Sequence, residues 1–334
     1  MKKCIVFALL FSVLIGNAFA QLSFSGTAYI GVQMEIPYDT SDDEIINPYH
    51  RTEGTPLFNL VATINRANHG VRLDTNFRED EVSVEGIYGW ADFLDNTLRV
   101  TMGRISSPAW IANLDPDNVF YFDAVTGFRV EYETPLPGLR VGIAFRTEGN
   151  TFEQLVQRPI LGATYFHPQF NAVFAYNMGS NGHILFGFNY TGIPDLTAGI
   201  QARITHVASW DDLGFGGVLD LKQRITYRIM RPLTVSLLTG QTVFAAPRGH
   251  DRANTAMFFT PGVSYIVNPE LTASFSVEIR SFDYFNNTRF ITFNPGIEYM
   301  LGGAVIYAEY ELRLARYRHD SFHRISVGVT FSVF

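Results

Sequence analysis

The chain has 334 residues, of which 47% are hydrophobic and 17% are charged, and its formal net charge is −7. An acidic chain without a basic tail is a poor partner for nucleic acid. Its single cysteine, Cys4, leaves the remainder without disulfides, thiol nucleophiles or cysteine-based zinc sites. We therefore expect no nucleic-acid partner, no cofactor and no metal.

Residues 1–20 have the features of a secretory signal peptide. Lys2 and Lys3 supply a positive start, and residues 5–15 form an apolar stretch that is too short to span a bilayer. The small-x-small sequence Ala18-Phe19-Ala20 follows as a cleavage site. We expect cleavage before Gln21 and a single mature domain over residues 21–334.

After the signal peptide, polar and apolar residues alternate in segment after segment. Val71 and Leu73, for example, interleave with Arg72 and Asp74. This period of two is typical of β-strands with one polar and one apolar face. Eighteen strands are predicted, with sixteen as the alternative count. They lie near 22–36, 57–66, 70–78, 82–93, 97–105, 126–134, 138–147, 158–167, 169–178, 182–190, 195–208, 218–230, 233–246, 255–267, 270–282, 288–300, 303–316 and 321–334.

The connections between these strands alternate as well. Tight turns rich in Pro, Gly or Asn, such as 135–138 and 302–303, alternate with longer segments such as 37–56 and 106–125. A membrane β-barrel has short periplasmic turns and longer external loops, and its closure pairs every strand. The pattern predicts an all-β, transmembrane, antiparallel up-and-down β-barrel. We expect it in the outer membrane of a diderm bacterium, in contact with lipid, with both termini periplasmic.

With the apolar phase facing lipid, arginines dominate the interior phase. A barrel of this strand number is too wide for side chains alone to fill, which favours a water-filled lumen. The alternative is that the interior charges neutralise one another around a plugged wall. The predicted pore-lining arginines are Arg72, Arg99, Arg129, Arg140, Arg146, Arg203, Arg224, Arg228, Arg280 and Arg313.

Residues 97–146 carry a more specific pattern. Gly103-Arg104 ends one strand, a long segment follows, and the next strand reads Gly127-Phe128-Arg129-Val130-Glu131-Tyr132-Glu133-Thr134-Pro135. This stretch resembles the general diffusion porins of Gram-negative bacteria. The resemblance implies passive diffusion of ions and small polar solutes, a homotrimer, and an inward-folded third external loop, here 106–125. Asp115, Asp117 and Asp123 would be its acidic constriction residues.

Two features depart from that family. Its barrels have sixteen strands, and its final strand tends to place apolar residues in phase with the terminal Phe. Here Thr330 and Ser332 share the phase of Phe334. The terminal Phe still suggests recognition of the last strand by the barrel-assembly machinery.

Other functions leave weaker signals in the sequence. A barrel hydrolase would need a nucleophile beside a base. Ser321 and His323 could form such a pair, but no known motif surrounds them. An adhesin or structural barrel would be indicated by long or repetitive external loops, and the predicted loops of this chain are neither long nor repetitive. We therefore expect no catalytic residues and no enzyme activity, and keep the adhesin and the hydrolase as alternatives.

Overall fold

The computed structural model describes residues 21–38, 45–48, 58–77, 82–105, 125–147, 159–178, 183–205, 218–244, 254–281, 289–316 and 320–333. These residues form one antiparallel sheet of nineteen strand segments. The strands are β1 (Gln21–Pro37), β2 (Ile45–Pro48), β3 (Phe58–Arg66), β4 (His69–Phe77), β5 (Val82–Phe93), β6 (Leu98–Ile105), β7 (Val125–Glu133), β8 (Leu139–Arg146), β9 (Pro159–His167), β10 (Phe170–Asn177), β11 (His183–Tyr190), β12 (Leu196–Thr205), β13 (Val218–Met230), β14 (Leu233–Phe244), β15 (Asn254–Ile266), β16 (Leu271–Ser281), β17 (Phe290–Leu301), β18 (Ala304–Ala315) and β19 (Phe322–Val333).

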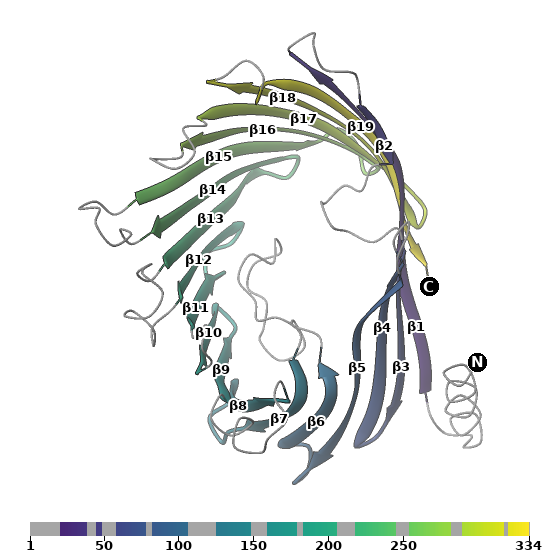
Figure 1. Cartoon of the computed structure of the whole chain (residues 1–334), viewed down its shortest axis with the longest axis vertical. Coiled ribbons are helices and arrows are strands. Elements are labelled where there is room, and N and C mark those ends of the chain that lie inside the picture. The colour runs from purple at the N-terminus through teal and green to yellow at the C-terminus, as the bar shows by residue number, and fades with distance from the viewer. Residues whose placement is uncertain are drawn as a thin grey trace.

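The sheet closes on itself. Each strand from β3 onward pairs with the next, and β1 pairs with β19 from Gly26 opposite Val333 to Pro37 opposite Phe322. Figure 1 shows the resulting ring, with β1 beside β19. Among the described strands, closure gives each strand position a neighbour on both sides, which is the condition for a sheet to cross a membrane.

The ring has eighteen strand positions. β2 pairs with residues 32–35 of β1, and β3 pairs with residues 21–28 of the same strand, both on the edge that β19 does not occupy. The two segments therefore share one position. The predicted eighteen-strand barrel is confirmed, and β2 is the one strand segment that the sequence did not predict, since it lies inside the expected loop 37–56.

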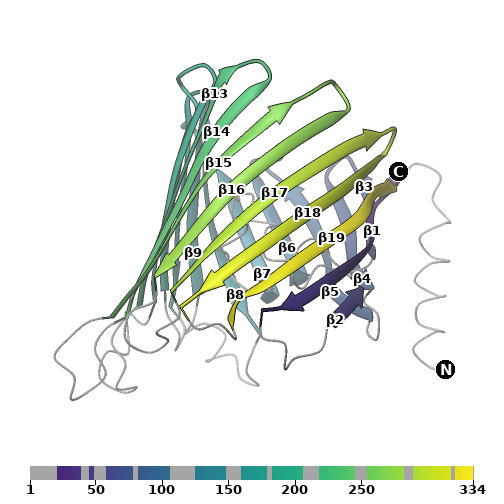
Figure 2. The ribbon, with the colours of Figure 1, turned by 90° about the horizontal axis from the view of Figure 1, so that it is seen from above.

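The short turns gather at one rim of the barrel. Figure 2 shows the β13–β14, β15–β16 and β17–β18 hairpins at that rim. Several of these turns contain residues with positive φ, namely Leu94, Asp95, Asn96, Gly138, Asp195 and Gly302. Asn, Asp and Gly tolerate this conformation best. The Pro, Gly and Asn signals therefore did locate the turns.

A bulge interrupts the pairing of β4 and β5. Asp74 lies opposite Gly86, whereas the next residue, Thr75, lies opposite Val84. Glu85 is left without a cross-strand partner, so the inward and outward phases of β5 exchange at this point. The chain thereby keeps apolar residues outside on both sides of the bulge.

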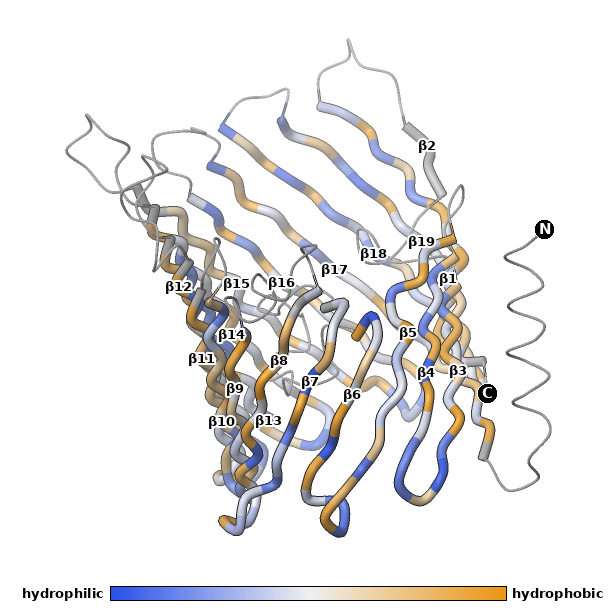
Figure 3. Tube along the Cα trace, turned by 60° about the horizontal axis from the view of Figure 1, so that its bottom comes forward, coloured by the Kyte–Doolittle hydropathy of each residue, from blue (hydrophilic) through white to orange (hydrophobic). Residues whose placement is uncertain are grey.

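The two faces of the sheet differ in polarity. Figure 3 shows hydrophilic and hydrophobic positions alternating along the strands. Large apolar side chains are highly exposed on one phase, among them Ile30 at 64%, Met102 at 62% and Ile297 at 53%. This is the lipid-facing pattern of a membrane barrel. None of the described residues belongs to a helix long and apolar enough to cross a membrane.

A tyrosine packs against a glycine next to the strand pair that closes the barrel. Tyr307 of β18 is fully buried and lies opposite Gly328 of β19. A Cβ atom at Gly328 would be 2.3 Å from the Tyr307 hydroxyl oxygen and 2.7 Å from the carbonyl oxygen of Ile30. The absence of a side chain at Gly328 therefore provides the space for the tyrosine ring.

Candidate pore and its lining

Most charged side chains of the described strands share one face of the closed sheet. Residues directly opposite each other on paired strands point to the same side, so register fixes which side chains are neighbours. Arg99 lies opposite Asp92 and Glu131, and Arg203 lies opposite Asp220. Because the other phase carries the exposed apolar residues, we assign the charged phase to the interior.

Most of the predicted pore-lining arginines form ion pairs on this inner wall. Eight of the ten have an acidic partner within 3.4 Å among the described residues. The pairs are Arg72–Asp74, Arg99–Asp92, Arg129–Glu131, Arg140–Glu133, Arg203–Asp220, Arg228–Asp195, Arg280–Glu278 and Arg313–Glu311. The charges of these eight arginines are therefore compensated locally by neighbouring carboxylates.

The remaining predicted residues divide into two groups. Arg224 lies on β13 and interacts with other groups. Several predicted features lie outside the described residues. They are the side chain of Arg146, residues 106–124 with Asp115, Asp117 and Asp123, the predicted signal peptide, and Phe334.

The pair Arg129–Glu131 is the most buried of these ion pairs. Arg129 Nη2 lies 2.7 Å from Glu131 Oε2, and only 4% and 7% of the two side chains are exposed. Nη2 also lies 3.4 Å from Thr101 Oγ1 on β6. Arg129 Nε and Nη1 are buried without a hydrogen-bond partner among the described residues. Burial strengthens the attraction of such a pair and raises the cost of breaking it.

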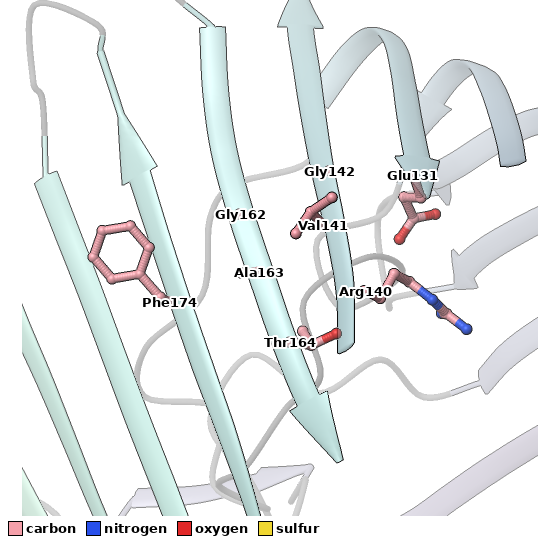
Figure 4. A pocket seen from close by; sticks show the side chains of 8 residues that line it. All are labelled: Glu131, Arg140, Val141, Gly142, Gly162, Ala163, Thr164 and Phe174. Atoms are coloured by element: carbon pink, nitrogen blue, oxygen red, sulfur yellow. The ribbon is translucent and has the colours of Figure 1, made fainter. Parts of the chain in front are cut away.

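Glu131 borders a small hollow in the wall between β7 and β9. Glu131 lies opposite Gly142, which is itself paired with Gly162, so these positions add no side chain beside the carboxylate. Figure 4 shows Glu131 and Arg140 close to each other at this place, with Thr164 on β9 nearby. The hollow is a detail of the wall and holds no metal-binding cluster among the described residues.

Beside this pair, the inner wall is apolar and covered. Ala144, Ile160, Val173, Ala175 and Leu185, on β8 to β11, all belong to the interior phase, yet their exposure is only 0 to 3%. Side chains on the wall of an empty, water-filled lumen would be accessible to water. This stretch of the wall is therefore in contact with other parts of the protein.

On the opposite stretch of the wall, arginines and phenylalanines alternate from strand to strand. Arg280 lies 5.5 Å from the Phe258 ring centre and 5.3 Å from that of Phe290. Arg313 lies 4.6 Å from Phe290 and 4.5 Å from Phe322. Arg324 continues the series, 4.4 Å from the Phe322 ring and paired with Glu35 and Glu311. Cation–π contacts and ion pairs together fix these guanidinium groups in place.

Sequence reasoning missed the aromatic members of this series and the acid Asp92. Phe258, Phe290 and Phe322 stand on the polar phase, where an apolar residue gives no signal of its own. Asp92 could have been found, because it and Arg99 are symmetrically placed about the turn at residues 94–97.

Ser321 and His323, the candidate hydrolytic pair, form hydrogen bonds with other residues. Ser321 Oγ accepts a hydrogen bond from the backbone N–H of Ala315 at 2.9 Å. His323 Nδ1 is hydrogen-bonded to the Tyr310 hydroxyl, and its ring stacks on Tyr38 at 5.1 Å. His323 belongs to an aromatic cluster on the outer face, because Leu312 and Ile36, its cross-strand neighbours, share the lipid-facing phase.

No protein-family model and no curated protein matches the sequence. In three dimensions the chain is similar to solved outer-membrane channels. An anion-selective porin from Comamonas acidovorans aligns with a TM-score of 0.63 and 12% identity, over 94% of this chain and 100% of that one. OccK11 (OpdR) of Pseudomonas aeruginosa aligns with a TM-score of 0.60 and 12% identity, over 94% and 96%.

A third similar structure, the outer membrane channel DcaP of Acinetobacter baumannii, has a TM-score of 0.54 and 11% identity, over 94% of this chain and 97% of that one. At these identities the likeness is one of fold. The resemblance that residues 97–146 suggested is confirmed at that level: the barrel has the fold of the bacterial outer-membrane porins.

Proposed function

From this porin fold we propose that the protein forms a water-filled channel in the outer membrane of a diderm bacterium and passes ions and small polar solutes by diffusion. The observation that carries the proposal is a closed barrel of eighteen strand positions, apolar outside and charged inside. Barrels of sixteen to eighteen strands leave an aqueous channel, whereas barrels of about eight strands can be filled by side chains. Diffusion needs no catalytic step, and we propose none.

We further propose that residues 106–125 fold into the lumen and narrow it. The covered apolar patch of β8 to β11 supports this idea, because it lies on the interior wall just beyond β7, where the segment rejoins the barrel. Val125 begins β7, four residues before the buried Arg129. In this arrangement Asp115, Asp117 and Asp123 would face the lumen and add negative charge to a wall that is otherwise balanced in pairs.

Such charges would set the selectivity of the channel. Paired arginines contribute little net potential to the lumen, because each carries its counter-charge within a few ångströms. Unpaired carboxylates on the constriction would therefore tip the balance toward cations. One structural neighbour is an anion-selective porin, so the fold itself does not dictate cation selectivity.

Export, assembly and orientation in the membrane follow the same proposal. Residues 1–20 would direct export and be removed, and the barrel-assembly machinery would recognise the last strand through Phe334. The short turns would lie in the periplasm together with both termini, and the lipid-facing phase would contact the membrane. The resemblance to the general diffusion porins supports a homotrimer.

Liposome swelling tests the proposal. Vesicles containing the folded protein should swell in isotonic solutions of small sugars, at rates that fall as the sugar becomes larger. Heat-unfolded protein in the same lipid is the control for leakage. If folded protein admits no sugar of any size, the barrel is not an open diffusion channel, and a role as a structural or adhesive barrel gains support.

A further inference from the structure

The outer face of the barrel carries a polar patch on β13 and β14. On the lipid-facing phase of the described strands, the only carboxamide side chains are Gln223 of β13 and Gln241 of β14. Thr239 lies between them, directly opposite Gln223 and two residues from Gln241. We call these three residues the carboxamide patch. Their phase is set by Lys222, which faces Gly240 on the interior wall and so directs both flanking positions outward.

The carboxamide patch lies within the apolar band and not at its edge. Along β13, Leu221 and Ile225 flank Gln223 on the outer phase. Along β14, Leu237 and Val243 flank the pair Thr239 and Gln241. Polar side chains at such positions would be in contact with lipid tails if the barrel were alone in the membrane.

The carboxamide patch is poorly satisfied within one chain. Thr239 Oγ1 donates a hydrogen bond to Gln223 Oε1 at 3.5 Å, the limit of such an interaction. No other hydrogen bond to the three side chains is found among the described residues. An amide in hydrocarbon without a partner is costly, and lipid tails offer neither donors nor acceptors.

The same residues border a hollow in the outer face. Its volume is about 410 Å³, and apolar side chains of β15 and β16, namely Met257, Phe259 and Ile279, form its other side. A hollow with polar side chains on one side and apolar side chains on the other suits a protein partner that fills it and supplies hydrogen bonds. Contacts between membrane-spanning segments use polar side chains in this way.

We propose that the carboxamide patch is where copies of this chain meet, close to the symmetry axis of the homo-oligomer. A carboxamide both donates and accepts hydrogen bonds, so the same patch on a second copy satisfies it. Around an axis, each Gln241 can donate to the carboxamide of the next copy and accept from the previous one. The inference rests on the proposed membrane location and gives the assumed assembly a specific interface.

Cysteine cross-linking in intact outer membranes tests this interface. In a Cys4→Ser background, Gln241→Cys should form a covalent dimer under a mild oxidant, because the two positions approach each other across the axis. Met102→Cys is the matched control, since it lies on the outer phase of β6 with 62% exposure. Cross-linking of Met102→Cys in preference to Gln241→Cys, or of neither, overturns the proposal.

A second variant removes the polar groups while keeping the side chains large. The triple change Gln223→Leu, Thr239→Val and Gln241→Leu should shift the native mass in mild detergent from oligomer to monomer. Thr126→Val on the outer face of β7 is the control. Sugar-driven swelling should survive in the monomer, which separates this inference from the channel proposal. Unchanged oligomer mass, or a lipid that copurifies with the wild type and is lost from the variant, contradicts the interface.

Discussion

Arg129 and Glu131 stand two residues apart on β7, point to the same side, and lie 2.7 Å apart at their charged ends. Almost none of either side chain is accessible to water. The nearby pair Arg140–Glu133 involves the same residue types, but about half of each side chain is exposed. The wall of one barrel thus offers a buried and an exposed version of the same interaction.

The first prediction concerns this difference. Glu131→Gln removes the charge that compensates a buried guanidinium, and the free energy of unfolding should fall by about 3 kcal/mol. Glu133→Gln breaks an exposed pair and should cost about 0–1 kcal/mol. Urea unfolding, followed by the migration of unheated protein in gels, measures both. The double change Arg129→Met and Glu131→Leu should recover most of the loss, and equal losses for the two glutamine variants would contradict the argument.

The second prediction concerns the tyrosine at the barrel closure. In Gly328→Ala the new methyl group would meet both the Tyr307 ring and the backbone oxygen of Ile30. Overpacking of this kind typically costs about 1–3 kcal/mol. Gly303→Ala is the control, because its Cβ would come no closer than 3.7 Å to the carbonyl oxygen of Ser332. Thermal unfolding on gels should show a lower midpoint for Gly328→Ala alone.

The third prediction concerns topology. Leu136, in the short turn between β7 and β8, is 54% exposed, and we place that turn in the periplasm. In a Cys4→Ser background, Leu136→Cys should resist a membrane-impermeant maleimide in intact cells and react once the outer membrane is opened. Thr40→Cys, in the expected external loop 37–56, should react in intact cells. Reaction of both cysteines from outside would rule out this orientation.

The fourth prediction concerns the segment 106–125. Changing Asp115, Asp117 and Asp123 together to asparagine should move the reversal potential in a salt gradient toward anions, because the change removes the negative charge that these carboxylates would add to the lumen. Conductance should change less than selectivity, since the asparagine side chains keep the size of the aspartates. Reversal potentials equal to those of the parent would show that these aspartates do not face the pore.

Much of the fold was predictable because the two faces of a membrane barrel differ in polarity, and this difference appears as an alternating pattern in the sequence. A period of two in residues such as Arg72 and Asp74 determines which side chains point inward, and tight Pro, Gly and Asn turns separate the hairpins. The eighteen strands followed from counting these signals. The bulge at Glu85 did not, because one inserted residue changes the phase without changing composition.

The lining was predictable only in part. Alternation assigned the arginines to the interior, but it cannot tell which of them is buried. Arg129 is covered and Arg228 is exposed because of tertiary contacts that no local pattern records. The pairing of Arg99 with Asp92 depends on register across a turn, which a period of two along a single strand does not determine. The aromatic rings beside Arg280 and Arg313 are apolar residues at interior positions. A prediction that assigns only polar residues to the interior cannot find them.

Single-channel recording in planar lipid bilayers tests most directly whether the barrel is an open, water-filled passage. Folded protein should insert in discrete steps, each with a current proportional to voltage, and conductance should rise with the bulk conductivity of the salt. Protein unfolded by heat before addition should give no steps. Folded protein that inserts into several lipid mixtures, as judged by protease protection, yet carries no current would contradict the account.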